Sequence, residues 1–190
     1  MGTPTISYVP VDPVAGAPAY ASTGTFATAS GVFPPLAFGH EAKFRDNQSG
    51  SANSGGAVAL FCQGSNVASA GQFVMISNNS AVLLDSGNST CFLPIGIAGG
   101  AMTATNVYGW VGVEGKFDNG AFTNVIFAAN GRVALGSTAG QVGSVTALGS
   151  GIRGIVPTQS YTSTDGSGVG YRALSVQLAR PFIIGVTASN

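Results

Sequence analysis

Few residues in this chain could carry acid–base or metal chemistry. Its 190 residues include a single histidine, His40, with seven acidic and seven basic residues. General acid–base catalysis needs titratable groups brought together, and metal sites need several His, Cys, Asp or Glu ligands. His40 stands beside Glu41, but no second histidine and no partner motif accompany the pair. We therefore expect a surface or structurally bonded histidine, no cofactor and no enzymatic activity.

Some segments of the sequence match the residue spacing of ligand-binding motifs but lack the flanking elements or ligands that those motifs need. Residues 149–154 (Gly-Ser-Gly-Ile-Arg-Gly) match the glycine spacing of a dinucleotide-binding loop. That loop needs a following helix whose N-terminus holds the phosphate, whereas Ile-Val-Pro follows here, the pattern of a strand that ends at proline. Residues 85–88 and 118–120 supply too few carboxylates for calcium and are interpreted as turns. Cys62 and Cys91 lie in apolar runs, which favours buried free thiols over a disulfide.

Charge is scarce and balanced along the chain. Charged residues make up 7% of the sequence and the formal net charge is zero, against about 25% charged residues in an ordinary globular domain. Neither nucleic acid nor a membrane is expected as a partner, because the chain lacks a basic footprint and an apolar run of about 18 residues. No targeting segment is recognised, so we expect a protein made and used in solution. Such a weakly charged surface favours self-association.

Residues 1–36 differ in composition from the remainder. They contain six of the nine prolines, and Asp12 is their only charged residue. Prolines at this density prevent a helix and interrupt strand ladders, so we predict an extended N-terminal arm without a core of its own. An arm that lies in grooves of neighbouring subunits and a disordered tail are both open interpretations. The hydrophobic residues that would contact a partner are Ile6, Tyr8, Val9, Tyr20, Phe26 and Phe33.

Residues 37–190 are interpreted as one all-β domain, either a β-sandwich or a β-barrel-like fold. Short apolar runs alternate with turn residues, and no window shows a helical stripe. The charged run within 37–54 predicts an edge strand followed by a loop, and Asn130-Gly131 is typical of a hairpin turn. The other expected strands are 56–63, 72–77, 81–84, 92–98, 108–116, 122–128, 132–135, 151–158, 171–178 and 182–186.

The stretch 108–117 (Tyr-Gly-Trp-Val-Gly-Val-Glu-Gly-Lys-Phe) carries the only tryptophan and predicts a central strand. Because side chains alternate along a strand, Val111 and Val113 are expected to face the core. The opposite face, with tyrosine and tryptophan at one end and Glu114 and Lys116 at the other, is expected to meet a neighbouring subunit. Glu114 is expected to form a cross-strand or subunit-interface ion pair.

Seven segments in a fixed order carry a family resemblance. They are Gly-Ala-Val-Ala-Leu-Phe-Cys-Gln-Gly at 56–64, Ala-Gly-Gln-Phe-Val at 70–74, Pro-Ile-Gly-Ile-Ala at 94–98, Tyr-Gly-Trp-Val-Gly-Val-Glu-Gly at 108–115, Ala-Gly-Gln-Val at 139–142, Gly-Ile-Arg-Gly-Ile at 151–155 and Phe-Ile-Ile-Gly-Val at 182–186. From Phe38 onward, over about three quarters of the chain, this order resembles the head decoration or cement proteins of tailed bacteriophages. The N-terminal arm lies outside the resemblance.

The resemblance implies a structural protein without catalysis, made in the host cytoplasm and located on the capsid exterior of the virion. It would bind the outer surface of an icosahedral capsid and stabilise it by bridging neighbouring major capsid proteins, as trimers or dimers at symmetry axes. The composition agrees, because many weak neutral contacts repeated by symmetry retain such a protein through avidity. The arm would add strands to the sheet edges of neighbours, so that copies exchange arms.

A carbohydrate-binding β-module, at a virion fibre tip or in an adhesin, is the alternative. Its binding residues would be exposed aromatics near the Gly/Ser-rich loop 162–170, such as Tyr161 and Tyr171. Buried aromatics are the commoner arrangement. Binding to purified capsids, rather than to host-surface glycans, distinguishes the two functions.

Overall fold

The computed structural model describes residues 7–10, 20–21, 36–46, 56–67, 69–85, 92–105, 107–122, 129–136, 138–144, 151–158 and 172–184. Every regular element in these ranges is a strand, which confirms the all-β fold, sandwich or barrel-like, that is expected from the sequence. The strands are β1 (Ser7–Pro10), β2 (Tyr20–Ala21), β3 (Glu41–Asp46), β4 (Gly56–Gly64), β5 (Phe73–Ser77), β6 (Ser80–Leu83), β7 (Ile95–Ala98), β8 (Tyr108–Phe122), β9 (Val133–Leu135), β10 (Val142–Ser144), β11 (Gly151–Pro157) and β12 (Arg172–Ile183). Within the described ranges, no helix is long and apolar enough to span a membrane.

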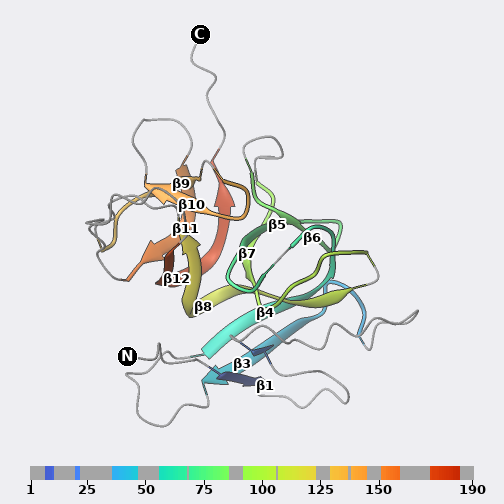
Figure 1. Ribbon diagram of the computed structural model, residues 1–190. Coiled ribbons are helices and arrows are strands. Elements are labelled where there is room, and N and C mark those ends of the chain that lie inside the picture. The colour runs from blue at the N-terminus through green and yellow to red at the C-terminus, as the bar shows by residue number, and fades with distance from the viewer. Residues whose placement is uncertain are drawn as a thin grey trace.

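The sheet closes on itself twice, and β8 belongs to both closures. Strands β4, β6, β5, β7 and β8 form one ring of hydrogen-bonded neighbours, and β8, β12, β11, β9 and β10 form another. The first part of β8, residues 108–114, pairs with β4, while residues 114–122 pair with β12. The second ring closes through the parallel pair Val142 and Phe122. Figure 1 shows β8 passing from the β4 side of the molecule to the β12 side.

Three further strands extend the sheet outward from β4. β3 pairs with β4, β1 pairs with β3, and β2 pairs with β1. The strand expected at the edge, within 37–54, is therefore internal among the described strands, which corrects that prediction. The reason is that part of the arm, β1, lies along its far side, with Tyr8 opposite Asp46. This stretch of the arm pairs with the sheet of its own chain.

Hydrophobic side chains cover both faces of the central strands. On β4, Phe61 belongs to a large core cluster and its neighbour Cys62 to a smaller one. On β8, Trp110 belongs to the large cluster, where its ring meets Phe44 and Phe61 edge-on at centroid distances of 5.1 and 5.3 Å. Burying an aromatic side chain of this size stabilises the fold by roughly 1.5–3 kcal/mol. The large cluster also continues into the second ring through residues of β11 and β12.

The tryptophan face of β8 is core, and the expectation that it meets a neighbouring subunit is wrong. Trp110 is fully buried and Tyr108 is only 4% exposed. Val111 and Val113, on the other face, are buried as expected and lie in the smaller cluster. A strand shared by two rings needs apolar residues on both faces, because a packed core lies on each side of it.

A β-bulge separates Glu114 from the tryptophan face. In the pairing of β8 with β4, Ala59 lies opposite Gly112, whereas the next β4 residue, Val58, lies opposite Glu114. Val113 is thus an extra residue, and such an insertion shifts the alternation of side chains by one. Beyond the bulge, Glu114 lies on the valine side of the strand. Counting alternate residues along the sequence, without the bulge, places Glu114 on the tryptophan face instead.

Two other boundaries also differ from expectation. The turn expected at 118–120 is part of β8, because β12 remains paired with β8 as far as Phe122. The register between β12 and β8 shifts between Leu174 and Val176. The strands expected at 171–178 and 182–186 are one continuous strand, β12, within which Arg180 adopts a left-handed backbone with φ of 46°.

Asparagine residues adopt left-handed backbones at two turns of the chain. Asn78 and Asn79 have φ of 47° and 63° and connect β5 directly to β6, as a type I′ hairpin turn requires. Asn130 also has a positive φ of 61°. The strand after it, β9, pairs with β10 and β11, and residues 123–128 lie outside the described residues, so the hairpin expected at Asn130-Gly131 stays a prediction. Residues 151–157 form β11 rather than a loop before a helix, which confirms that the glycine pattern there is not a phosphate-binding motif.

Candidate interaction site

An apolar pocket of about 350 Å³ lies where the first ring meets the end of β12. Its walls come from β4, β8, the start of β7 and the last residues of β12. Pockets at the mouths of β-barrels, lined by apolar groups with few polar ones, are typical binding sites. The apolar residues that form the walls are Leu60, Val113, Pro94, Ile95, Pro181 and Phe182.

Phe92 also lines this pocket. Its side chain is 75% exposed, and its backbone is left-handed with φ of 68°. The ring stacks on Phe182 at a centroid distance of 6.5 Å, and the Phe92 amide donates a hydrogen bond to the Ile183 carbonyl at 3.3 Å. A bulky residue rarely adopts positive φ, and a large exposed aromatic is more informative than an exposed small residue. The ring is held in place on the surface.

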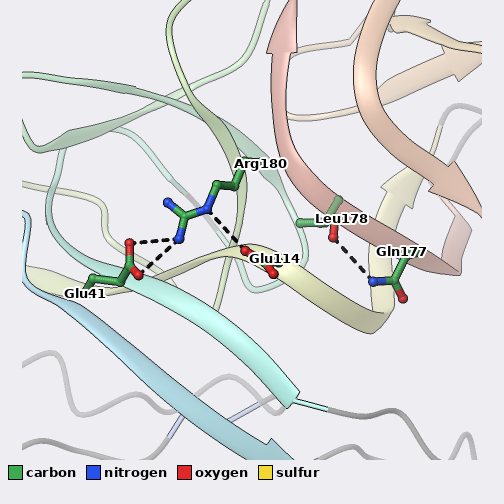
Figure 2. Close-up of polar contacts among 5 residues, drawn as sticks. All are labelled: Glu41, Glu114, Gln177, Leu178 and Arg180. Carbon is green, nitrogen blue, oxygen red and sulfur yellow. Dashed lines mark hydrogen bonds and ion pairs between the residues drawn. The ribbon is translucent and has the colours of Figure 1, made fainter.

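Arg180 forms the charged wall of the pocket, and two glutamates fix its position (Figure 2). Its Nε donates to Glu114 Oε2 at 3.2 Å, and its Nη2 donates to both carboxylate oxygens of Glu41 at 3.0 and 3.1 Å. The hydrogen bond to Glu41, and then that to Glu114, raises the pKa of Arg180. The three side chains are 40–56% exposed, so each pair contributes at most about 1 kcal/mol. Their main effect is to orient and neutralise the guanidinium.

The ion pair of Glu114 confirms one expectation from the sequence, a pairing of this residue across strands. Glu114 was expected to pair across strands, and it does so with Arg180 of β12, one residue beyond its register partner Ala179. Lys116 is half-buried two residues further along β8. A role for Glu114 and Lys116 in a contact with another subunit stays a prediction.

Arg180, Glu41 and Phe92 were not recognised as site residues from the sequence. They come from three distant parts of the chain, and only the fold brings them together around the pocket. For Arg180, a usable signal was its position as a single charge within an apolar stretch of the sequence. In a chain with 7% charged residues, such charges need partners when strands pair.

The candidate arm residues fall in two groups. Tyr8 and Val9 lie in β1 and Tyr20 lies in β2. The others lie outside the described residues: Ile6, Phe26 and Phe33, together with Tyr161 and Tyr171 of the carbohydrate-binding alternative. Contacts of the arm with a partner therefore stay predictions.

The remaining reactive groups form no metal centre in the described part of the chain. The ring of His40 lies 6.5 Å from that of Trp110, between centroids. The described residues contain no group of three or more His, Cys, Asp or Glu able to hold a metal ion. Cys62 is a buried free thiol, as expected, and burial raises its pKa to about 12. Cys91 lies outside the described residues.

Comparisons with protein-family models, with curated proteins and with solved structures find no match. What the chain does is therefore inferred from its own residues and geometry. The resemblance to phage head decoration proteins stays a prediction.

Proposed function

We propose that the protein is a structural virion protein that binds the outer surface of an icosahedral phage capsid and stabilises it by bridging neighbouring major capsid proteins. The supporting observation is the pairing of three arm residues, Tyr8, Val9 and Pro10, with β3. This segment, despite its proline, adds a strand to the sheet of the domain. Strand addition uses backbone hydrogen bonds and needs no charge, so the same mode suits attachment to the sheet edge of a neighbour.

The composition supports attachment through many weak contacts. With charged residues at 7% and no net charge, individual contacts with the capsid are mainly neutral hydrogen bonds and apolar contacts. Repetition of such contacts around symmetry axes gives retention through avidity. Retention on the capsid should therefore depend weakly on salt, because few charges are available for screening.

Co-sedimentation with assembled capsids tests the proposal. The full chain should pellet with capsids at a saturating ratio to the major capsid protein, and salt should change this ratio little. Removal of residues 1–36 should weaken capsid binding while the domain keeps a cooperative thermal transition. Loss of that transition would show that the arm belongs to the domain core, and the truncation would then not report on binding.

A parallel assay addresses the carbohydrate-binding alternative. The same protein is applied to immobilised host-surface glycans and to capsids at equal concentration. Binding to capsids alone supports the capsid function. Binding to glycans, with no protein in the capsid pellet, would replace it with a fibre-tip or adhesin function.

A further inference from the structure

The sequence contains two Asn-Gly pairs, Asn119-Gly120 and Asn130-Gly131, and the fold places them in different surroundings. We propose that Asn130 is a site of spontaneous deamidation, at which the chain acquires a negative charge without an enzyme, while the strand around Asn119 protects that residue. The reaction needs only the chain and water. It goes beyond the proposed function and does not depend on capsid binding.

Deamidation begins when a backbone amide nitrogen attacks the side chain of the preceding asparagine. Here the nitrogen of Gly131 forms a bond to Cγ of Asn130, the bond from Cγ to Nδ2 breaks, and the amide proton leaves with Nδ2 as ammonia. Water then opens the resulting succinimide ring at one of its two carbonyls. Opening at Cγ leaves an aspartate at position 130. Opening at the main-chain carbonyl leaves an isoaspartate, whose main chain is one methylene longer.

The surroundings of Asn130 leave this attack open. Asn130 lies in the turn before β9, is exposed to solvent and has a left-handed φ of 61°. Its own amide donates to the Pro157 carbonyl at 2.9 Å, which anchors the turn. The amide of Gly131, by contrast, forms no hydrogen bond within the described part of the chain. Glycine also has no Cβ and turns easily, so the attacking nitrogen can rotate toward Cγ.

The pair Asn119-Gly120 has the same residues but lies inside a paired strand. Gly120 of β8 is buried and lies opposite Leu174 of β12. A Cβ at position 120 would stand 3.1 Å from Val176 Cγ1 and 3.3 Å from Phe73 Cζ, so the backbone has little room to turn. Ring closure there requires that β8 first separates from β12. Each ~1.4 kcal/mol of such local opening slows the reaction by about tenfold.

Peptide mapping by tandem mass spectrometry measures both sites in one sample. The full chain is held in mildly alkaline buffer, and the replacement of NH2 by OH at each asparagine is followed over time. In the folded chain, Asn130 should convert faster than Asn119 by about tenfold or more. In concentrated guanidinium chloride the two sites should convert at comparable rates, because no strand then protects either of them. The difference between the two conditions is the contribution of the fold.

Two substitutions assign the product to position 130. Asn130→Gln should remove the reaction there, because glutamine has to close a six-membered ring, which forms much more slowly. Asn130→Asp should migrate with the deamidated wild type on isoelectric focusing, as a more acidic form than the unmodified chain. This variant should keep the fold, since aspartate, like asparagine, tolerates a positive φ.

Four results would overturn the proposal. These are conversion of Asn119 as fast as that of Asn130 in the folded chain, the same preference for Asn130 in denaturant, an undiminished acidic form in Asn130→Gln, and a folded chain that stays unmodified at Asn130 while the denatured chain converts. Because no capsid is present, none of these results bears on the proposed capsid function. Equally, failure to bind capsids leaves the deamidation site untouched.

Discussion

Gly112→Ala should destabilise the protein through its effect on Phe117. Gly112 lies in β8 next to the bulge, and the buried Phe117 ring occupies the space above it. A Cβ at position 112 would stand 2.5 Å from Phe117 Cε1 and closer still to Cζ, whereas ordinary contacts begin at 3.4 Å. The ring must therefore move by about 1 Å, inside a core where Phe117 is only 2% exposed.

The expected loss follows from two opposing effects. Overpacking a core costs about 1–3 kcal/mol, and complete expulsion of a phenylalanine ring about 3–5 kcal/mol. Replacing glycine by alanine without strain stabilises by roughly 0.4–1 kcal/mol, because it restricts the unfolded chain. A net destabilisation of roughly 1–2 kcal/mol is the result if the ring shifts but stays buried.

Urea unfolding of a double-mutant cycle isolates this contact. The cycle comprises the wild type, Gly112→Ala, Phe117→Leu and the double variant, and leucine lacks the ring atoms that meet the new methyl group. The loss caused by Gly112→Ala should disappear in the leucine background, which gives a coupling of roughly 1–3 kcal/mol between neighbours. Gly56→Ala, whose Cβ would lie 3.4 Å from the Phe44 carbonyl oxygen, is the control and should be neutral or slightly stabilising. An equal loss in both backgrounds would refute the assignment of Phe117 as the obstacle.

Substitutions at Arg180 and Cys62 probe the site and the core. Arg180→Ala removes both ion pairs and should lower the free energy of unfolding in urea by up to about 1–2 kcal/mol. Arg180→Gly should lower it less, because glycine accepts the positive φ. A larger loss for glycine than for alanine would contradict a strained backbone at position 180. Cys62 has a folded pKa of about 12 against an ordinary 9.0, so above pH 9 the unfolded chain loses a thiol proton that the folded chain retains. In a Cys91→Ser background the free energy of unfolding should therefore fall as pH rises from about 9 to about 12, and Cys62→Ala should lack this component. The same slope in the alanine variant would assign it to other groups.

Much of the strand content could be predicted from the sequence, because local chemistry determines it. The expected strand 56–63 is β4 (Gly56–Gly64), and the Asn-Asn pair after β5 forms a tight turn of the kind that asparagine favours. Scarce helix formers and frequent glycine made the all-β class clear. These features depend on neighbours within a few residues, which a single sequence displays.

The bulge at Val113 could not be predicted in the same way. A period of two indicates faces only while the ladder is regular, and an extra residue appears only when the register of both strands is known. The error at Trp110 has a related cause. A strand that serves two rings is buried on both sides, and nothing in the ten residues around Trp110 shows that a second ring exists.

The candidate site could not be predicted from the sequence for a different reason. Glu41, Glu114 and Arg180 meet only because β3, β4, β8 and β12 become neighbours in the closed sheet. Strand order of this kind depends on long-range contacts rather than on local propensity. The left-handed backbones of Phe92 and Arg180 are likewise set by the fold, since neither residue type favours positive φ.

Electron microscopy of phage capsids incubated with the purified protein tests the central claim most directly. The account predicts additional density on the outer surface of the shell, repeated at capsid symmetry axes, into which the two joined β-rings fit. Density that bridges neighbouring major capsid proteins would support stabilisation of the shell. A capsid surface without added density at saturating protein, or density only at the tail or fibres, would contradict the proposed function.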